Sequence, residues 1–387
     1  MPENPLPNEN PLPAEAVKTA ELNCPLCGVV VFPGEGFCEA CGHRLTGDAQ
    51  AAEGTEPEPA GACVGCGGGG IDEDGYCEQC GLRQPAERDH VEVELAGRVA
   101  AGASDRGKRY ARNEDALALA AHPGGVAVVV SDGVGSSPNP DQASRAAADQ
   151  GVAELLARLE AGAAPEAAMR AAMARAAKAV TALAASPAEA PSCTFVSAVT
   201  APGAVTVGWV GDSRAYWLSS APPDPAAAPD GGSPLDTLDL VAADKPELGA
   251  SRALTADDSW AAFMIAEGAL TEAEAEAHPN AHVITGWLGA DNEDLRPHVA
   301  AFVPDPNVPG TLLVCSDGLW NYLPAPEDLA AVLTAAAVDP AADPLGAARA
   351  LLRRALDAGG RDNITVAVIP LPPAGSPSPS NPLERER

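Results

Sequence analysis

Acidic residues stand where apolar, strand-like segments of this chain begin or end. Asp132, Asp212 and Asp317 each follow such a segment, and Asp362 precedes another. A lone Asp is costly to bury and is more usual in a turn or at a helix N-terminus. Several aspartates at strand ends are better explained by a hard divalent cation, because all-oxygen sites suit Mg²⁺ or Mn²⁺. The pattern, together with a further acidic motif around Glu114, predicts a carboxylate metal site.

Eight of the ten cysteines form a repeat with a period of 39 residues. Each copy has two Cys-x2-Cys pairs separated by ten residues: Cys24, Cys27, Cys38 and Cys41, then Cys63, Cys66, Cys77 and Cys80. Two such pairs supply the four thiolates that Zn²⁺ prefers, and redox dithiols are the weaker alternative. Each copy has almost no apolar core of its own, so we expect the metal to supply its folding free energy. The other two cysteines, Cys193 and Cys315, lie in apolar segments and are expected in the core.

The remaining pattern gives the elements that must position these groups. Apolar runs predict strands at residues 125–131, 193–200, 204–210, 311–315 and 364–369, and helical composition predicts helices at 142–159, 165–184, 327–337 and 345–356. We expect a disordered tail at 1–20, cysteine repeats at 21–45 and 62–83, a linker at 46–61, a large domain at 91–370 with a loop insertion at 219–235, and a disordered tail at 371–387. The mixture of strands and helices indicates one large α/β or α+β domain.

Charge and hydropathy exclude several classes of protein. The net charge is −30, from 24 basic and 54 acidic residues, which argues against nucleic-acid binding and against adhesion to anionic membranes. No run of 18 apolar residues predicts a membrane helix, and the first twenty residues lack the features of a secretory signal. A cytoplasmic location is therefore expected, and in that reducing compartment cysteines serve as metal ligands more often than as disulfides.

The motifs of the large domain, taken together and in order, resemble those of the metal-dependent, type-2C protein Ser/Thr phosphatases (the PPM family) of bacterial type. They are Ser104-Asp105-Arg106-Gly107, Arg112-Asn113-Glu114-Asp115-Ala116, Ser131-Asp132-Gly133-Val134-Gly135, Val210-Gly211-Asp212-Ser213-Arg214-Ala215-Tyr216, Leu254-Thr255, His282-Val283-Ile284-Thr285, Ser316-Asp317-Gly318-Leu319-Trp320 and Gly360-Arg361-Asp362-Asn363-Ile364-Thr365. The cysteine repeats resemble the double zinc ribbons that precede many bacterial signalling domains.

The PPM resemblance implies an α+β fold, a two-sheet β-sandwich flanked by helices in four αββα layers. It implies two or three Mg²⁺ or Mn²⁺ ions at one edge of the sandwich, and a metal-bridging water that attacks phosphorus directly. Carried over by position, Asp132 would bridge two metals, Asp317 and Asp362 would hold the first, and the Gly133 carbonyl and Glu114 would hold the second. The metal set is completed by Asp115 beside Glu114 and by Asp212, which with Asp317 would offer a third site.

Two positions depart from the family pattern. Many eukaryotic members have, at the position of Val134, a His that acts as general acid. Many bacterial members lack this His, as this chain does. Tyr110 stands where the family places a phosphate-binding Arg, and it is flanked by Arg109 and Arg112. In an extended segment, Tyr110, Arg112 and Glu114 would share one face. We therefore expect Arg112, rather than Arg109, to bind phosphate, with a surface ion pair as the alternative.

The leading hypothesis is a phosphatase acting on phosphoserine and phosphothreonine in proteins, which opposes a Ser/Thr kinase. The alternative is a catalytically weak, phosphatase-like protein that recognises phosphoproteins and uses its zinc ribbons, with two structural Zn²⁺, to dock a protein partner. A metal-dependent nuclease would share the carboxylates, but the acidic charge speaks against it. Retention of every metal-ligand position favours the enzyme.

Overall fold

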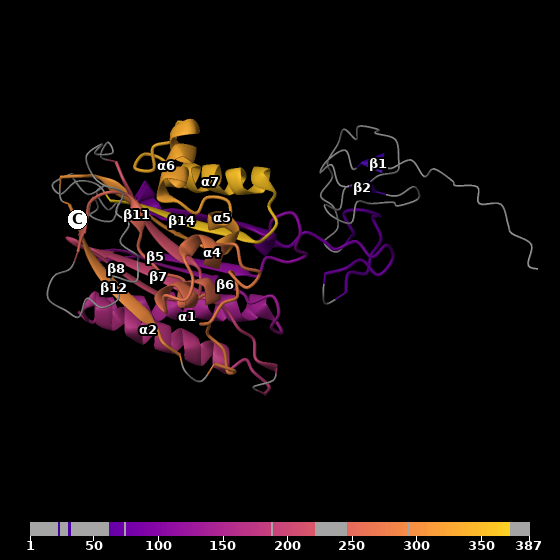
Figure 1. Cartoon of the computed structure of the whole chain (residues 1–387). Coiled ribbons are helices and arrows are strands. Elements are labelled where there is room, and N and C mark those ends of the chain that lie inside the picture. Colours follow the sequence, from indigo (N-terminus) through magenta and orange to yellow (C-terminus); the bar gives the residue numbers. More distant parts are fainter. Residues whose placement is uncertain are drawn as a thin grey trace, which may run out of the picture. The chain divides into compact units, whose positions relative to one another are not determined.

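The computed structural model describes residues 22–23, 30–31, 62–72, 75–186, 189–220, 246–292, 295–305 and 307–371. The chain separates into two units, residues 1–84 and 85–387 (Figure 1). The predicted segments 1–20 and 46–61, and the tail beyond Leu371, lie outside the described residues. So does the predicted insertion at 219–235, apart from Ser219 at the end of a strand and Ser220.

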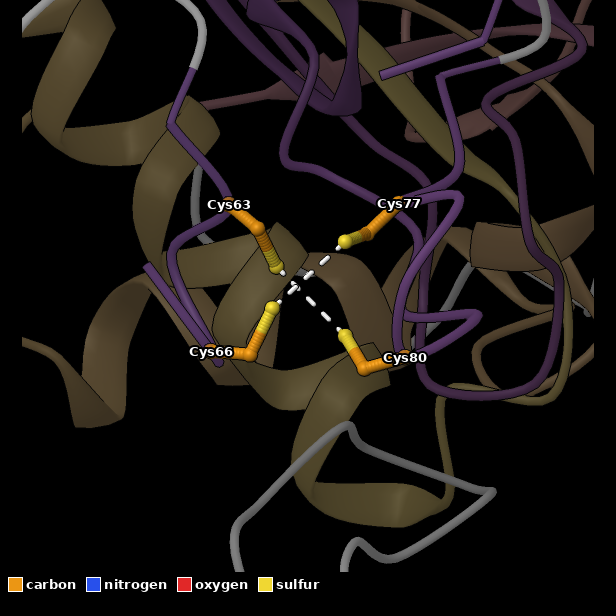
Figure 2. A group of neighbouring side chains, drawn as sticks. All are labelled: Cys63, Cys66, Cys77 and Cys80. Atoms are coloured by element: carbon orange, nitrogen blue, oxygen red, sulfur yellow. Dashed lines mark hydrogen bonds between the residues drawn. The ribbon is translucent and has the colours of Figure 1, made fainter. Parts of the chain in front are cut away.

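Unit 1 is described chiefly around the second cysteine repeat. Its sulfur atoms point toward a common centre (Figure 2). Short bridges pair Ala62 with Gly69 and Ile71 with Cys77. Of the first repeat, only two short antiparallel strands are described, β1 (Leu22–Asn23) and β2 (Val30–Val31), and its four cysteines lie outside the described residues.

Unit 2 contains two six-stranded sheets, and most neighbouring strands within each sheet are antiparallel. The first sheet has, in spatial order, β10 (Glu247–Leu248), β12 (His298–Pro304), β8 (Ala204–Val210), β7 (Phe195–Ala201), β6 (Gly125–Asp132) and β5 (Asp115–His122). The second has β11 (Arg252–Ala253), β9 (Arg214–Ser219), β13 (Gly310–Cys315), β14 (Ile364–Leu371), β4 (Ala101–Asp105) and β3 (His90–Glu94).

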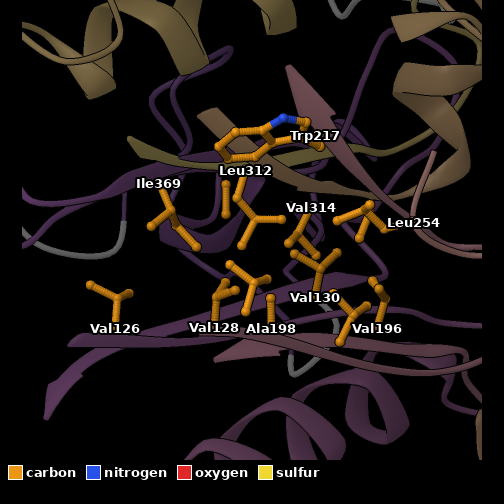
Figure 3. Packing of buried hydrophobic residues seen from close by; sticks show 14 of the residues in the cluster. Val126, Val128, Val130, Val196, Ala198, Trp217, Leu254, Leu312, Val314 and Ile369 are labelled. Carbon is orange, nitrogen blue, oxygen red and sulfur yellow. The ribbon is translucent and has the colours of Figure 1, made fainter. Parts of the chain in front are cut away.

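The sheets pack face to face because alternate residues of their strands are apolar on the inner side. Val126, Val128 and Val130 of β6 meet Leu312 and Val314 of β13 in the central core (Figure 3). The intervening residues of β13 point outward into a second core beneath helices. Strands with both faces buried read as continuous apolar runs, which is why the sequence predicts them well.

Helices cover both outer faces and complete the four αββα layers predicted for this chain. On the first sheet lie α1 (Pro140–Glu160) and α2 (Pro165–Thr181), and on the second lie α5 (Asp317–Trp320), α6 (Pro326–Ala335) and α7 (Pro344–Ala358). Proline opens α1, α2, α6 and α7, where its missing N–H costs nothing. The observed bounds match the four predicted helices closely.

A smaller helical segment links β11 to β12 and carries α3 (Trp260–Ala266) and α4 (Glu272–Glu276). Two 3-10 turns, η1 (Glu87–Asp89) and η2 (Ala96–Arg98), flank β3. None of the helices in the described part of the chain combines the length and apolar character needed to cross a bilayer.

Candidate metal centre

The antiparallel topology brings the predicted acidic residues to one edge of the sandwich. In the first sheet, β6 ends at Asp132 where β5 begins at Asp115, and the two residues are directly paired. In the second sheet, β13 ends just before Asp317, where β14 begins just after Asp362. Neighbouring antiparallel strands begin and end at the same edge, so four carboxylates from two sheets gather there.

Asp212 joins this group from the turn between β8 and β9. It is 7% exposed, and its backbone carbonyl accepts a hydrogen bond from Nε1 of Trp320 at 2.9 Å. The Arg214 guanidinium lies 3.7 Å from the centre of the Trp320 ring and binds both carboxylate oxygens of Asp257, at 2.8 and 2.7 Å. This stack fixes the turn that carries Asp212 against the helix that begins with Asp317.

Two carboxylate oxygens of the cluster are buried without any hydrogen-bond partner, Oδ1 of Asp115 and Oδ1 of Asp317. The other oxygen of Asp115 accepts bonds of 2.7 Å from the hydroxyls of Ser316 and Thr365. Oδ2 of Asp317 accepts one from Asn321 at 3.1 Å. Buried acceptors without donors are costly, and a divalent cation bound by oxygen would satisfy them. The residues present therefore fit a Mg²⁺ or Mn²⁺ site.

The crowding of carboxylates perturbs their acidity. Burial raises the pKa of Asp132 well above its ordinary 3.8, and the charges of Asp115, Asp317, Asp212 and Asp362 raise it further. Burial likewise raises the pKa values of the other carboxyls, to about 7 for Asp115 and for Asp362. Such mutual repulsion marks a site that needs external positive charge.

Glu114 is half-buried next to this cluster, in the loop between β4 and β5. Its backbone N–H donates to Oδ1 of Asn363 at 2.7 Å, and its carbonyl accepts from the Gly133 N–H at 3.1 Å and from the Ser144 hydroxyl. Burial and the charge of Asp141 raise the pKa of the Glu114 carboxyl. The structure thus brings Glu114 and Gly133 together with the aspartates.

Several residues that hold this site were not assigned by sequence reasoning. The Asn363 side chain also donates to the carbonyls of Arg106, at 2.8 Å, and Arg112, at 3.0 Å, which fixes the whole 106–114 loop. Asn363 and Thr365 lie within the motif that runs from Gly360 to Thr365, and that motif could have identified them as residues of the site. A third residue, Arg88, donates to the carbonyl of Asn113, and no motif contains it.

The prediction that Arg112 shares a face with Tyr110 and Glu114 assumed an extended segment, and the segment is not extended. Residues 107–109 form a turn and 111–112 a bend, because the chain reverses at Gly107, which has a φ of 71°. Tyr110 is exposed, and the charge of Asp362, followed by partial burial and the charge of Glu114, raises the pKa of its phenol. Arg112 is half-buried and its charge favours the ionised form of Glu114, whereas Arg109 is exposed.

Cys193 and Cys315 are fully buried in the core, as predicted. Burial raises the pKa of each thiol to about 12. A thiolate nucleophile is therefore not available from either residue.

The second cysteine repeat forms a separate candidate metal site. The four Sγ atoms all lie within 4.8 Å of one another, with Cys63 to Cys80 at 3.6 Å and Cys66 to Cys77 at 3.5 Å. A tetrahedral zinc site with Zn–S bonds of about 2.3 Å has sulfur atoms roughly 3.8 Å apart. The N–H groups of Gly65 and Gly68 donate to two of the sulfurs, at 3.3 and 3.4 Å, as backbone donors do around bound thiolates.

Comparison with known proteins places this geometry in context. Residues 102–246 match the family model described as Protein phosphatase 2C. The chain is 28% identical to Serine/threonine phosphatase stp of Listeria welshimeri over 176 residues, 46% of this chain and 55% of that protein. It is 36% identical to Protein phosphatase PhpP of Streptococcus pneumoniae over 116 residues, 30% of this chain and 44% of that protein. The chain therefore spans about half the length of the curated relatives that it matches.

Solved structures extend the likeness to 70% or more of the chain. The Mycobacterium tuberculosis serine/threonine phosphatase PstP/Ppp superposes with a TM-score of 0.52 at 25% identity, covering 70% of this chain and 96% of that one. The PPM Ser-Thr phosphatase MsPP from Mycobacterium smegmatis, solved with cacodylate, superposes with a TM-score of 0.50 at 28% identity, covering 73% of this chain and all of that one. The fold is an α+β fold of the PPM type.

Proposed function

We propose that this chain is a metal-dependent protein phosphatase of the bacterial PPM type, which hydrolyses phosphoserine and phosphothreonine on proteins. The observation that carries the proposal is the convergence of Asp132, Asp212, Asp317 and Asp362 with Asp115 and Glu114 at one edge of the sandwich, where buried carboxylate oxygens lack partners. The names of the matched relatives support the same activity.

In this proposal, Asp132, Asp317 and Asp362 would hold a first Mg²⁺ or Mn²⁺ ion. Asp132, Glu114 and the Gly133 carbonyl would hold a second, and Asp212 with Asp317 would offer a weaker third site. The bound metals would lower the pKa of water and neutralise charge on the transferred phosphoryl group.

Asp115 has fewer oxygen atoms available for a metal ion than a carboxylate that accepts no hydrogen bonds. Ser316 and Thr365 occupy one of its oxygens, which leaves only Oδ1 to face Asp132 across the β5–β6 pair. We infer that Asp115 orients the metal ligands and contributes at most that one oxygen. Ser316 precedes Asp317 in the chain, so the same network also fixes the start of α5.

Water is the nucleophile in this proposal. The buried thiols of Cys193 and Cys315 are protonated at neutral pH, so they do not attack phosphorus. Val134, at the position of the eukaryotic general acid, offers no proton, so the leaving group takes its proton from solvent or from a group of another segment. Direct hydrolysis requires no phosphorylated enzyme.

The alternative, a phosphoprotein-binding domain without turnover, is less well supported. It would be expected to have lost at least one metal ligand, and each expected ligand position is occupied by a suitable side chain or carbonyl. Tyr110 replaces the usual phosphate-binding guanidinium and is the one feature that favours weak catalysis.

For unit 1 we propose a structural Zn²⁺ bound by Cys63, Cys66, Cys77 and Cys80, on the strength of the sulfur spacing. The identical spacing of the first repeat suggests a second Zn²⁺ at Cys24, Cys27, Cys38 and Cys41. A zinc-bound module of this kind would dock a protein partner.

Hydrolysis of p-nitrophenyl phosphate tests the proposed activity. We expect the purified chain to be active with Mn²⁺, inactive with EDTA, and active again after Mn²⁺ is restored. Asp317→Asn should lose at least about a hundredfold in kcat, whereas Asp149→Asn, on the exposed face of α1, should match the wild type. Equal rates for wild type and Asp317→Asn would show that the site is assigned wrongly.

A phosphopeptide assay tests the substrate class. We expect release of inorganic phosphate from phosphoserine and phosphothreonine peptides. Mn²⁺ binding without release from any ester would favour the binding protein instead.

A further inference from the structure

Arg88 lies outside every motif of the chain, yet its side chain reaches the loop that carries Glu114. Its Nη1 binds Oδ2 of Asp141 at 2.6 Å, and its Nη2 donates to the carbonyl of Asn113 at 2.7 Å. The guanidinium thus joins the first turn of α1 to the residue that directly precedes Glu114. The Arg88 side chain is 27% exposed and that of Asp141 is 14% exposed, so the ion pair is largely shielded from solvent.

The contact is reciprocal. Nδ2 of Asn113 donates back to the Arg88 carbonyl at 3.1 Å and to the Ser104 hydroxyl at 2.8 Å. Asn113 is 1% exposed, so these bonds are made in a dry environment where each missing partner is costly. The side chain of each of these two residues, Arg88 and Asn113, therefore donates to the backbone carbonyl of the other.

The start of α1 holds Glu114 as well. Ser144, three residues after Asp141, donates its hydroxyl to the Glu114 carbonyl. Arg88 therefore connects α1 to Asn113, the neighbour of Glu114, while Ser144 connects α1 to Glu114 itself. The two terminal nitrogens of the planar guanidinium fork serve these two partners separately, Nη1 binding Asp141 and Nη2 binding the Asn113 carbonyl.

We propose that Arg88 is a positioning residue that holds the Glu114 loop in its metal-binding arrangement. This inference rests on the proposed metal site, because it assigns a support to one of that site's ligands. Partners of this kind, which orient a ligand without touching the metal, are typically worth about ten- to a hundredfold in metal affinity.

The experiment measures Mn²⁺ binding to the full chain by the loss of the free-ion electron paramagnetic resonance signal. It compares the wild type with Arg88→Lys and Arg88→Met. Lysine keeps the charge but has one ammonium in place of the fork, so it separates positioning from simple electrostatics. The matched control is Arg349→Lys, because Arg349 binds both carboxylate oxygens of Glu92 and so anchors β3 at a place away from Glu114.

We expect Arg88→Lys to weaken one of the two Mn²⁺ sites about tenfold and to leave unchanged the other, which is held by Asp317 and Asp362. Arg349→Lys should bind both ions as the wild type does. If Arg88→Lys bound Mn²⁺ as the wild type does and only Arg88→Met bound it more weakly, the charge of Arg88 alone would explain its effect. That result would overturn the proposal. Equal weakening of both sites by Arg88→Lys and Arg349→Lys would also overturn it, since general loosening would then be the cause.

The wild type serves as the check on the premise. If the wild type bound no Mn²⁺, the proposed metal site itself would be refuted. If it bound Mn²⁺ and Arg88→Lys did the same, only the role of Arg88 would fall.

Discussion

Removal of metal should make the large unit less stable as the pH rises, which is the reverse of the usual acid sensitivity of proteins. The carboxyls of the cluster have pKa values above their ordinary 3.8, and that of Asp362 is raised to about 7 by burial and by the charge of Asp317. A raised pKa in the folded state means that folding favours the protonated form. The stability gained from that proton is fully present below pH 3.8 and is lost as the pH rises through 7.

The size of the effect follows from the pKa of Asp362 alone. Between pH 5 and pH 8, a group with a pKa of about 7 in the folded chain and 3.8 in the unfolded chain loses roughly 2–3 kcal/mol of stability. For a unit of this size, that corresponds to a fall of about 3–5 °C in Tm. The other raised carboxyls act in the same direction.

Tryptophan fluorescence is a suitable assay, because all five tryptophans lie at or beyond Trp209 and so report on unit 2 alone. Thermal unfolding is followed at pH 5 and pH 8, with EDTA or with saturating Mn²⁺. With Mn²⁺ present, the carboxylates are neutralised and the Tm at pH 8 should rise above that of the metal-free chain.

Asp362→Asn isolates the contribution of one group, with the exposed Asp149→Asn as its control. In EDTA, Asp362→Asn should be more stable than the wild type at pH 8 and should show a shallower fall between pH 5 and pH 8. The reasoning would be refuted if the metal-free wild type were equally stable at both pH values, or if Asp362→Asn showed the wild-type slope.

Three further predictions concern other parts of the chain. Gly318→Ala should lower the free energy of unfolding by about 1–3 kcal/mol in denaturant titration, because an added Cβ would clash with the backbone carbonyl of Asn363; unchanged stability would contradict the close packing of α5 on β14. Cys77→Ser should reduce the zinc content from two ions per chain to one by elemental analysis, and a value of two would place zinc elsewhere. Tyr110→Arg should lower KM for p-nitrophenyl phosphate several-fold and Arg112→Ala should raise it about tenfold, and unchanged KM in both would mean that the metals alone bind the phosphate.

The buried strands and long helices were predictable because their sequence pattern and their environment agree. Residues 204–210 were predicted as a strand with the bounds that β8 has, since both faces of that strand are covered and almost every residue is apolar. The end of β6 at Asp132 was predictable for the same reason. Where a buried strand meets an acidic residue, local sequence indicates both the element and the site.

Other elements carry no such local signal. β4, with the sequence Ala-Gly-Ala-Ser-Asp, has poor strand propensity and is a strand because β14 and β3 pair with it on either side. The turn after Gly107 was missed because an extended segment was assumed between two strands. Arg88 was missed because its partners lie 25 and 53 residues away in the sequence, and no periodicity records such contacts.

The position of Arg88 has a practical consequence for anyone who shortens this protein. Gln84, the last residue of unit 1, donates to Sγ of Cys63, and Arg88 follows only four residues later. A chain cut at residue 91, where the sequence suggests that the large domain begins, would keep every strand of both sheets nearly whole but would discard this guanidinium. Reduced activity of that fragment would be read as evidence that the zinc-binding unit activates the phosphatase, although a single missing side chain could be the cause. A fragment that begins at residue 85 avoids this confusion, and comparison of the two fragments would separate domain regulation from an error in the choice of boundary.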